Sequence, residues 1–192
     1  MSTHVPDRAE ASAKILLDAD GLGRTLSRIA HEIIERNDDL SRLALVGIHT
    51  RGVPLAERLA TLIEERSGEE VALGAVDITF HRDDTVAGHE QPVVHATTLA
   101  FELRGATVVL VDDVLYTGRT IRAAIETIFE HGRPARVQLA VLVDRGHREL
   151  PIRPDYVGKN LPTARSERIQ VELEEKDGRD RILLVGAPEE AA

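Results

Sequence analysis

The most informative part of the sequence is the stretch Val108-Val-Leu-Val-Asp112-Asp113-Val-Leu-Tyr-Thr117-Gly118-Arg119-Thr120. The apolar run at residues 107–111 is continuous, which is typical of a strand buried on both faces of a parallel sheet. From residue 120 to about 130, apolar residues recur with helical spacing. Because ligands in open α/β sheets bind outside the carboxyl ends of the strands, this order predicts an α/β fold with a ligand site at residues 112–120.

The sequence on either side alternates short apolar runs with amphipathic stretches. This alternation predicts a single domain over residues 14–186, with a central, mostly parallel sheet flanked by helices. The other expected strands lie at residues 14–17, 43–48, 72–80, 137–143, 155–158, 169–173 and 181–185. The other expected helices run from an N-cap at Asp20 to about Asn37, and from the turn that holds Pro54 to about Gly68.

Three segments do not fit this regular pattern. We expect residues 1–13 to be a disordered leader and residues 187–192 to be a frayed tail. Residues 81–103 are polar, are interrupted by Gly88 and Pro92, and show no clear periodicity. A stretch of this length inside a compact domain is usually functional or mobile.

The composition excludes several classes of site. The chain has 192 residues and no cysteine, so disulfides, thiolate metal sites and cysteine nucleophiles are excluded. It has no apolar signal-peptide segment and no run of about eighteen apolar residues, which predicts a cytoplasmic protein without a membrane span. The net charge of −9 argues against nucleic-acid binding over the whole surface. All but three of the 24 basic residues are arginines, which bind phosphate bidentately, although such a bias can also reflect genome composition.

The residue types at 112–120 indicate which ligand groups they bind. The first-turn amides near residues 117–120 are unpaired donors at the positive end of a helix dipole, which suits a phosphate. Gly118 allows close approach, and the hydroxyls of Thr117 and Thr120 add donors. Asp112 and Asp113 would repel a phosphate but can accept hydrogen bonds from the vicinal hydroxyls of a ribose. The alternative is that Asp113 only caps the helix and Asp112 is solvated. The sequence contains no G-x-x-x-x-G-K-[ST], which disfavours a P-loop NTPase.

Two acidic residues after four apolar ones, followed by Thr-Gly-Arg-Thr, resemble the motif of type I phosphoribosyltransferases that binds 5-phosphoribosyl-1-pyrophosphate (PRPP). Further stretches resemble the PyrR family, namely residues 28–37, 46–52, 77–84, 142–153 and 156–160, so that the resemblance covers about residues 15–185. That family consists of bacterial regulators of pyrimidine biosynthesis that retain uracil phosphoribosyltransferase activity. The resemblance implies a type I phosphoribosyltransferase fold with a small hood and a flexible lid within about residues 81–103.

The resemblance also implies a role for each matching position in the reaction of uracil with PRPP, which gives UMP and pyrophosphate. The residues implied to bind substrate are Thr50, Arg51, Asp112, Asp113, Val114, Leu115, Tyr116, Thr117, Gly118, Arg119, Thr120, Arg145 and Ile169. Residues 50–52 match the pyrophosphate loop, in which a strained peptide exposes an amide. Arg145 would lie at the pyrimidine, and Ile169 would cover the base or simply belong to the core. Mg²⁺ would be carried by PRPP, with no direct protein ligands.

The residues implied to act in catalysis are Arg51, Arg82, Asp112 and Asp113. Arg82, with Asp83 and Asp84, begins the segment that would close over the substrate and exclude water. Two alternatives remain open from the residues alone. Arg51 could be a solvated side chain in an ordinary turn before a helix, and residues 82–84 could be a surface cluster of salt bridges.

The family resemblance further implies binding of a hairpin in the leader of pyr mRNA, promoted by uridine nucleotides such as UMP or UTP. The implied RNA-binding residues are Arg24, Thr25, Arg28, His31, His147, Arg153, Lys159 and Arg165. Arg24, Arg28 and His31 share one side of the first expected helix, which could equally be a solvated face with local ion pairs. The resemblance implies a homodimer or a higher homo-oligomer.

Two other functions remain open at this stage. The protein could be an RNA regulator whose active site survives only as a nucleotide sensor. It could also be a salvage phosphoribosyltransferase for another base, with no RNA role.

Overall fold

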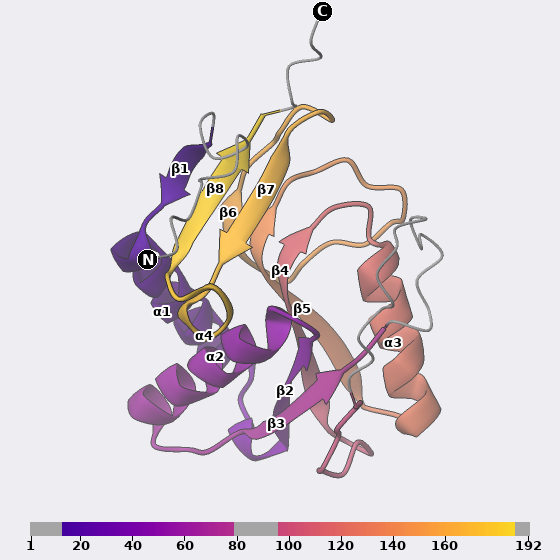
Figure 1. Ribbon diagram of the computed structural model, residues 1–192. Helices are drawn as coiled ribbons and strands as arrows, with labels where there is room; N and C mark the ends of the chain where they lie inside the picture. The colour runs from indigo at the N-terminus through magenta and orange to yellow at the C-terminus, as the bar shows by residue number, and fades with distance from the viewer. Residues whose placement is uncertain (1–12, 79–95, 187–192) are drawn as a thin grey trace, which may run out of the picture.

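The computed structural model describes residues 13–78 and 96–186. A five-stranded parallel sheet forms its centre, with the order β3-β2-β4-β5-β6. These strands are β2 (Leu43–Ile48), β3 (Ala72–Val76), β4 (Thr107–Leu115), β5 (Arg136–Asp144) and β6 (Tyr156–Asn160). The helices α1 (Ala19–Arg36) and α2 (Gly52–Ser67) cover one face, and α3 (Arg119–His131) covers the other (Figure 1). The predicted α/β class is therefore confirmed.

A second, smaller sheet forms a hood over the carboxyl ends of the central strands (Figure 1). It is antiparallel and has the order β1-β8-β7. Its strands are β1 (Lys14–Leu17), β7 (Arg168–Glu172) and β8 (Arg181–Val185), and the short helix α4 (Glu174–Asp177) lies in the turn between β7 and β8. The hood that the family resemblance implies is thus present.

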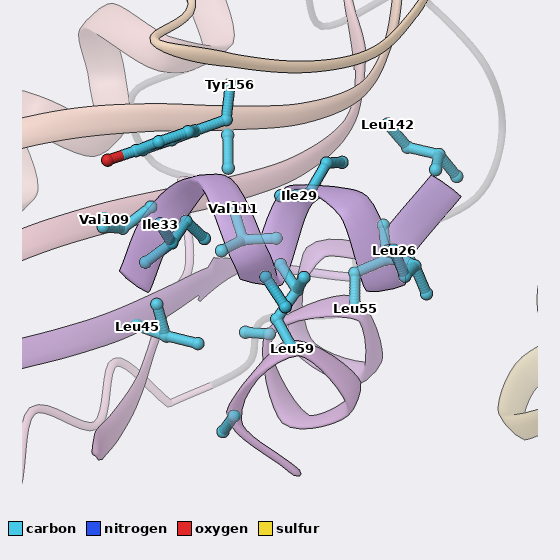
Figure 2. Close-up of a cluster of buried hydrophobic side chains, with 14 of the residues drawn as sticks. Leu26, Ile29, Ile33, Leu45, Leu55, Leu59, Val109, Val111, Leu142 and Tyr156 are labelled. Atoms are coloured by element: carbon cyan, nitrogen blue, oxygen red, sulfur yellow. The ribbon is translucent and has the colours of Figure 1, made fainter. Parts of the chain in front are cut away.

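The main core lies between the central sheet and the helices α1 and α2. Figure 2 shows Leu26, Ile29 and Ile33 of α1 packed with Leu55 and Leu59 of α2 and with strand residues such as Val109 and Val111, all of them buried. The alternate residues of β4, Val108 and Leu110, pack on the other face beneath α3. Side chains alternate across a strand, so a continuous apolar run supplies both layers.

Strand β4 is longer than predicted. The apolar run ends at Val111, but the parallel pairing with β5 continues through Asp112 and Val114 to Leu115. Backbone hydrogen bonding therefore extends the strand past the point where its side chains become polar. As a result, the two predicted ribose ligands lie within the strand instead of in the loop after it.

Two other predicted boundaries are also wrong. The N-cap of α1 is Asp18, whose Oδ1 accepts a hydrogen bond from the Gly21 amide at 2.8 Å, and Asp20 lies inside the first turn. Strand β3 ends at Val76, short of the predicted residue 80, and residues 79–80 lie outside the described part of the chain. The remaining strand and helix ends differ from the prediction by two residues at most.

Within residues 13–78 and 96–186, every helix is too short or too polar to cross a membrane. The predicted leader at residues 1–13 falls outside the described residues except for Ala13, and the predicted tail at 187–192 does so entirely.

Candidate active site

A pocket of about 650 Å³ opens at the carboxyl ends of β2 and β4. From β2 the chain crosses through α2 to β3 on one side, whereas β4 lies on the other side of β2. The order in which successive strands are added therefore changes direction between β2 and β4. Open α/β sheets bind ligands at such a point. The pocket is lined by residues 49–51 after β2, by residues 112–121 of β4 and α3, and by Ile78, Arg145, Glu149, Arg168 and Ile169.

Glycines bring the start of α2 into direct contact with the strands β2 and β4. A Cβ atom on Gly52 would lie 2.2 Å from the carbonyl oxygen of Val111, and one on Gly47 would lie 2.4 Å from the Cα of Val53. Side chains at these positions would push the start of α2 away from the sheet. The close packing carries Thr50 and Arg51 to the same pocket as Asp112. The peptide bond between His49 and Thr50 is cis.

The acidic pair does not cap the helix that follows it. Asp112 is only 7% exposed, and its Oδ1 accepts a hydrogen bond from the Asp113 amide at 2.9 Å. Asp113 Oδ1 accepts one from the Val114 amide at 2.8 Å. The N-cap of α3 is Gly118, without a side-chain capping bond. The alternative reading of a capping Asp113 and a solvated Asp112 is therefore wrong, and both carboxylates line the pocket.

Residues 112–120, here called the phosphate loop, end in a turn that suits an anion. Gly118 has a φ of 95°, in the left-handed region that favours glycine. The turn leads directly into α3, whose first amides have no acceptor within the helix and lie at the positive end of its dipole. Thr117 Oγ1 accepts a hydrogen bond from the Arg119 amide at 3.3 Å. The amides and threonine hydroxyls of this turn form the kind of cradle that binds a phosphate.

The segment after β5 supports the phosphate loop from behind. The Thr117 carbonyl accepts hydrogen bonds from the amides of Glu149 and Leu150, at 3.0 and 3.2 Å. Arg148 donates to the carbonyl of Tyr116 at 2.8 Å and also to Asp144 at 2.5 Å. The sequence reasoning missed this support, because most of it runs through backbone groups that no side-chain pattern reveals.

Arg145 forms one wall of the pocket. Its side chain is buried and donates to Thr163 Oγ1 at 3.1 Å and to the Glu167 carbonyl at 2.8 Å. The guanidinium carbon lies 4.1 Å from the centre of the Tyr116 ring. Arg145 is thus in the pocket as predicted, but its donors hold the 163–167 loop, and its guanidinium stacks on the Tyr116 ring. Ile169 also lines the pocket and packs against the core.

Arg51 lies at the N-cap of α2 and lines the pocket. Its Nη2 donates to Asp177 Oδ1 of α4 at 2.8 Å, so the side chain is not the solvated arginine of the alternative reading. Arg58, further along α2, binds Glu175 and Asp180 of the turn between β7 and β8, here called the hood turn (residues 172–181). The Arg58 guanidinium lowers the pKa of both carboxylates below the ordinary range, and its own pKa is raised, chiefly through the hydrogen bond with Asp180.

The predicted RNA-binding residues do not all lie at the surface. Arg24, Arg28, His31, Arg153, Lys159 and Arg165 are exposed. Thr25 is buried, its hydroxyl donates to the Gly21 carbonyl, and it therefore lies on the inward side of α1 instead of the exposed stripe. His147 is half-buried, with Nε2 2.6 Å from the Thr163 carbonyl. Arg28 donates to the Val157 and Gly158 carbonyls, which places Lys159 close to α1.

The structure brings together all the predicted substrate-binding residues. Each of the thirteen, from Thr50 to Ile169, lines the one pocket. Arg82, Asp83 and Asp84 lie outside the described residues, as does most of the predicted lid. The sequence reasoning missed five lining residues, namely His49, Ile78, Ile121, Glu149 and Arg168. Of these, His49, Ile121 and Arg168 are immediate neighbours of predicted residues, so adjacency along the chain was the available signal.

Comparison with known proteins agrees with this geometry. The family described as "Phosphoribosyl transferase domain" matches residues 12–176. A protein of Pelotomaculum thermopropionicum named "Bifunctional protein PyrR" is 56% identical over 174 residues, which is 91% of this chain and 96% of that protein. A protein of the same name from Deinococcus radiodurans is 57% identical over 169 residues, or 88% of this chain and 92% of that one.

Solved structures with the same fold are more distant in sequence. The hypoxanthine phosphoribosyltransferase of Trypanosoma cruzi aligns with a TM-score of 0.68 at 19% identity, over 92% of this chain and 97% of that one. The corresponding enzyme of Staphylococcus aureus aligns with a TM-score of 0.70 at 16% identity, over 98% of this chain and 100% of that one. These similarities confirm the type I phosphoribosyltransferase fold. Together with the sequence matches, they show that the chain belongs to the PyrR family of phosphoribosyltransferases.

Proposed function

We propose that the protein transfers the phosphoribosyl group of PRPP to uracil, which gives UMP and pyrophosphate. One observation carries the proposal. The pyrophosphate-type loop at Thr50 and Arg51, the Asp112–Asp113 pair and the anion-binding turn at residues 117–120 line one pocket. These three groups correspond to the diphosphate, the ribose hydroxyls and the 5′-phosphate of PRPP.

The chemistry fits a site that works by positioning its substrates. In the reaction, the bond from ribose C1 to the diphosphate oxygen breaks, a bond from C1 to uracil N1 forms, and the N1 proton leaves. The phosphate loop and the two carboxylates would hold the ribose phosphate in place, and Arg51 would stabilise charge on the departing pyrophosphate. The wall formed by Arg145, Tyr116 and Ile169 would hold the base.

Mg²⁺ is the metal implied for this reaction. It prefers oxygen ligands and usually binds proteins through one or two carboxylates together with substrate phosphates. Here the metal would be carried by PRPP without direct protein ligands, and the carboxylates of Asp112 and Asp113 lie in the same pocket beside it. The residues required beside a metal carried by PRPP are therefore present, and the metal would supply charge neutralisation at the diphosphate.

A panel of uracil, hypoxanthine, guanine and other bases, assayed with PRPP and Mg²⁺, tests the proposal. We expect turnover with uracil alone. The double variant Asp112→Asn/Asp113→Asn should lose turnover and bind UMP more weakly, because amides accept fewer hydrogen bonds from the ribose hydroxyls and carry no charge. A protein that binds UMP but does not convert uracil and PRPP would favour a nucleotide sensor. Turnover with a purine would favour a salvage enzyme. Normal activity of the double variant would contradict the assignment of Asp112 and Asp113 to the ribose hydroxyls.

We also propose that the protein binds a hairpin of pyr mRNA in response to uridine nucleotides. Two observations favour this second function. The close relatives are named bifunctional. In addition, Arg24, Arg28 and His31 of α1 lie exposed near Lys159 of β6. Arg28 pairs with Glu32 and His31 lies 3.3 Å from Glu35, as the alternative of local ion pairs expected, so Arg24 and Lys159 are the basic groups of this surface with which RNA phosphates would pair first. We further propose that the protein acts in the cytoplasm as a homodimer or a higher homo-oligomer, with residues 14–186 as one domain and a lid within about residues 81–103.

Binding of a labelled pyr leader hairpin, measured at fixed salt with and without UMP, tests the RNA role. Arg24 is exposed, so Arg24→Ala should weaken RNA binding and reduce the salt dependence while uracil turnover stays normal. Arg28→Ala should weaken binding as well, but its guanidinium also bonds β6, so Arg24→Ala is the cleaner variant. Unchanged affinity in both variants would contradict the proposed surface.

A further inference from the structure

The carboxylate of Asp177 holds the Arg51 side chain from the hood. Asp177 Oδ1 accepts the hydrogen bond from Arg51 Nη2 at 2.8 Å, and Asp177 Oδ2 accepts one from the Leu173 amide at 2.9 Å. The two residues are far apart in sequence, and α4 lies beside the amino end of α2 (Figure 1). With a partner on each oxygen, the carboxylate has a fixed orientation.

The turn that carries Asp177 is itself anchored to α2. Arg58 follows Arg51 by two helical turns, so the two side chains leave the same side of α2. Arg58 donates to both oxygens of Glu175 at 2.7 and 2.6 Å and to both oxygens of Asp180 at 2.8 Å. Asp180 Oδ1 also accepts the Glu174 amide at 2.8 Å. Bidentate pairs of this kind fix geometry as well as charge, so the turn holds Asp177 in place.

Among the described residues, the hydrogen bond to Asp177 takes up only one of the two terminal nitrogens of Arg51. The side chain lines the pocket and is 34% exposed. Among the described residues, its buried Nε has no hydrogen-bond partner. A free arginine side chain would lose considerable rotamer entropy on binding a diphosphate, whereas one already held by a carboxylate would lose less.

We propose that Asp177 is a positioning residue that orients the Arg51 guanidinium toward the diphosphate of PRPP, an inference that rests on the proposed function. Asp177 does not contact the substrate in this arrangement; it acts through Arg51. The opposite role would be that of a competing counter-ion, which leaves Arg51 when the diphosphate binds. The two roles predict opposite changes in diphosphate affinity when the Asp177 charge is removed. Loss of a positioning residue would weaken diphosphate binding, whereas removal of a competitor would strengthen it.

The variant Asp177→Asn tests the inference. Steady-state KM values for PRPP and uracil would be measured together with the dissociation constants of pyrophosphate and UMP. We expect the KM for PRPP and the dissociation constant of pyrophosphate to rise about tenfold, the factor expected for loss of one charge-assisted hydrogen bond. The KM for uracil and the affinity for UMP should not change, because neither ligand has a diphosphate. Asp177→Glu should restore part of the loss.

Glu175→Gln provides the matched control. It removes one carboxylate of the same turn, but Arg58 keeps Asp180 and Arg51 keeps Asp177. We expect this variant to bind PRPP and UMP as the wild type does.

Unchanged or tighter pyrophosphate binding by Asp177→Asn would overturn the positioning role. An equal loss of PRPP and UMP affinity would also overturn it, because such a loss indicates general damage to the fold. A wild-type protein that binds neither PRPP nor UMP would instead refute the proposed function, and the inference with it.

Discussion

The phosphate loop and the hood turn (residues 172–181) serve the same pocket, but different forces hold them. The phosphate loop is fixed by parallel pairing of β4 with β5 and by backbone hydrogen bonds to the Thr117 carbonyl. The hood turn is fixed by ion pairs, namely Arg51–Asp177, Arg58–Glu175, Arg58–Asp180, Arg179–Glu172 and Arg181–Glu172. Backbone hydrogen bonds do not depend on protonation between acid and neutral pH, whereas ion pairs do. The sheet therefore holds the phosphate loop in place, whereas the position of Arg51 on the other side of the pocket depends on charged groups.

The largest effect should come from a change that moves the start of α2, with Thr50 and Arg51, away from β4 and the phosphate loop. In Gly52→Ala, the new Cβ would lie 2.2 Å from the Val111 carbonyl oxygen, so the start of α2 must move away from β4. We expect the free energy of unfolding, measured in urea, to fall by about 3 kcal/mol, as for a strongly overpacked core. PRPP binding should be lost as well, because Thr50 and Arg51 move with the helix.

Gly23→Ala is the matched control for this variant. Gly23 is an exposed residue in α1, and a Cβ there would meet no atom within 4 Å. Because alanine favours the helix over glycine, this change should raise the free energy of unfolding by up to about 1 kcal/mol. A Gly52→Ala protein with wild-type stability and PRPP binding would show that the start of α2 is not tightly packed against β4.

The same contrast explains which parts of the site could be predicted from the sequence. The groups of the phosphate loop are contiguous, so residues 108–120 contain the strand, the acidic pair and the predicted anion-binding turn in order. The partner of Arg51 is Asp177, 126 positions away, and no periodicity links the two. The support from Glu149 and Leu150 comes from backbone amides, which carry no residue signature. Asp18 and Asp20 are both acceptable caps by type, and only the backbone geometry selects Asp18.

A smaller effect is expected from the charge network of the hood turn. Glu172 is 4% exposed and accepts hydrogen bonds from Arg181 Nε at 2.5 Å and from Arg179 Nε at 2.6 Å. The hydrogen bond from Arg181 is the main cause that lowers the pKa of Glu172 from 4.5 to about 2, with Arg179 adding to it. The folded protein therefore binds this proton more weakly than the unfolded chain does. The resulting stabilisation is complete above the ordinary pKa and is lost as the pH falls toward 2.

Glu172→Gln should accordingly lower the free energy of unfolding by about 2 kcal/mol at pH 7, a figure reduced for screening by solvent. At pH 3 the difference between wild type and variant should shrink, because the wild-type stabilisation is then partly lost. Urea denaturation of both proteins at the two pH values measures this. Glu65→Gln, at an exposed glutamate of α2, should show little difference at either pH. A Glu172→Gln effect of equal size at pH 3 and pH 7 would contradict the ionic account.

The smallest effect should come from removal of the Tyr156 hydroxyl, a polar group within the apolar core beneath α1. Tyr156 is fully buried; its hydroxyl accepts a hydrogen bond from Asn37 Nδ2 at 3.0 Å and donates one to Gln138 Oε1 at 3.2 Å. Burial raises the pKa of Tyr156, so the hydroxyl stays neutral at every pH of the comparison. Tyr156→Phe should lower the free energy of unfolding by about 1 kcal/mol, because Asn37 keeps its bond to the Ile33 carbonyl while Gln138 loses a donor.

This loss should be the same at pH 3 and pH 7, unlike that of Glu172→Gln, because no partner of the hydroxyl titrates in that range. Tyr116→Phe, at the partly exposed tyrosine of the phosphate loop, should change the free energy of unfolding by less than about 0.5 kcal/mol. If the loss of unfolding free energy in Tyr156→Phe changed with pH, the core beneath α1 would depend on charge as the hood turn does. The contrast between a pH-independent central sheet and a charge-dependent hood turn would then fail.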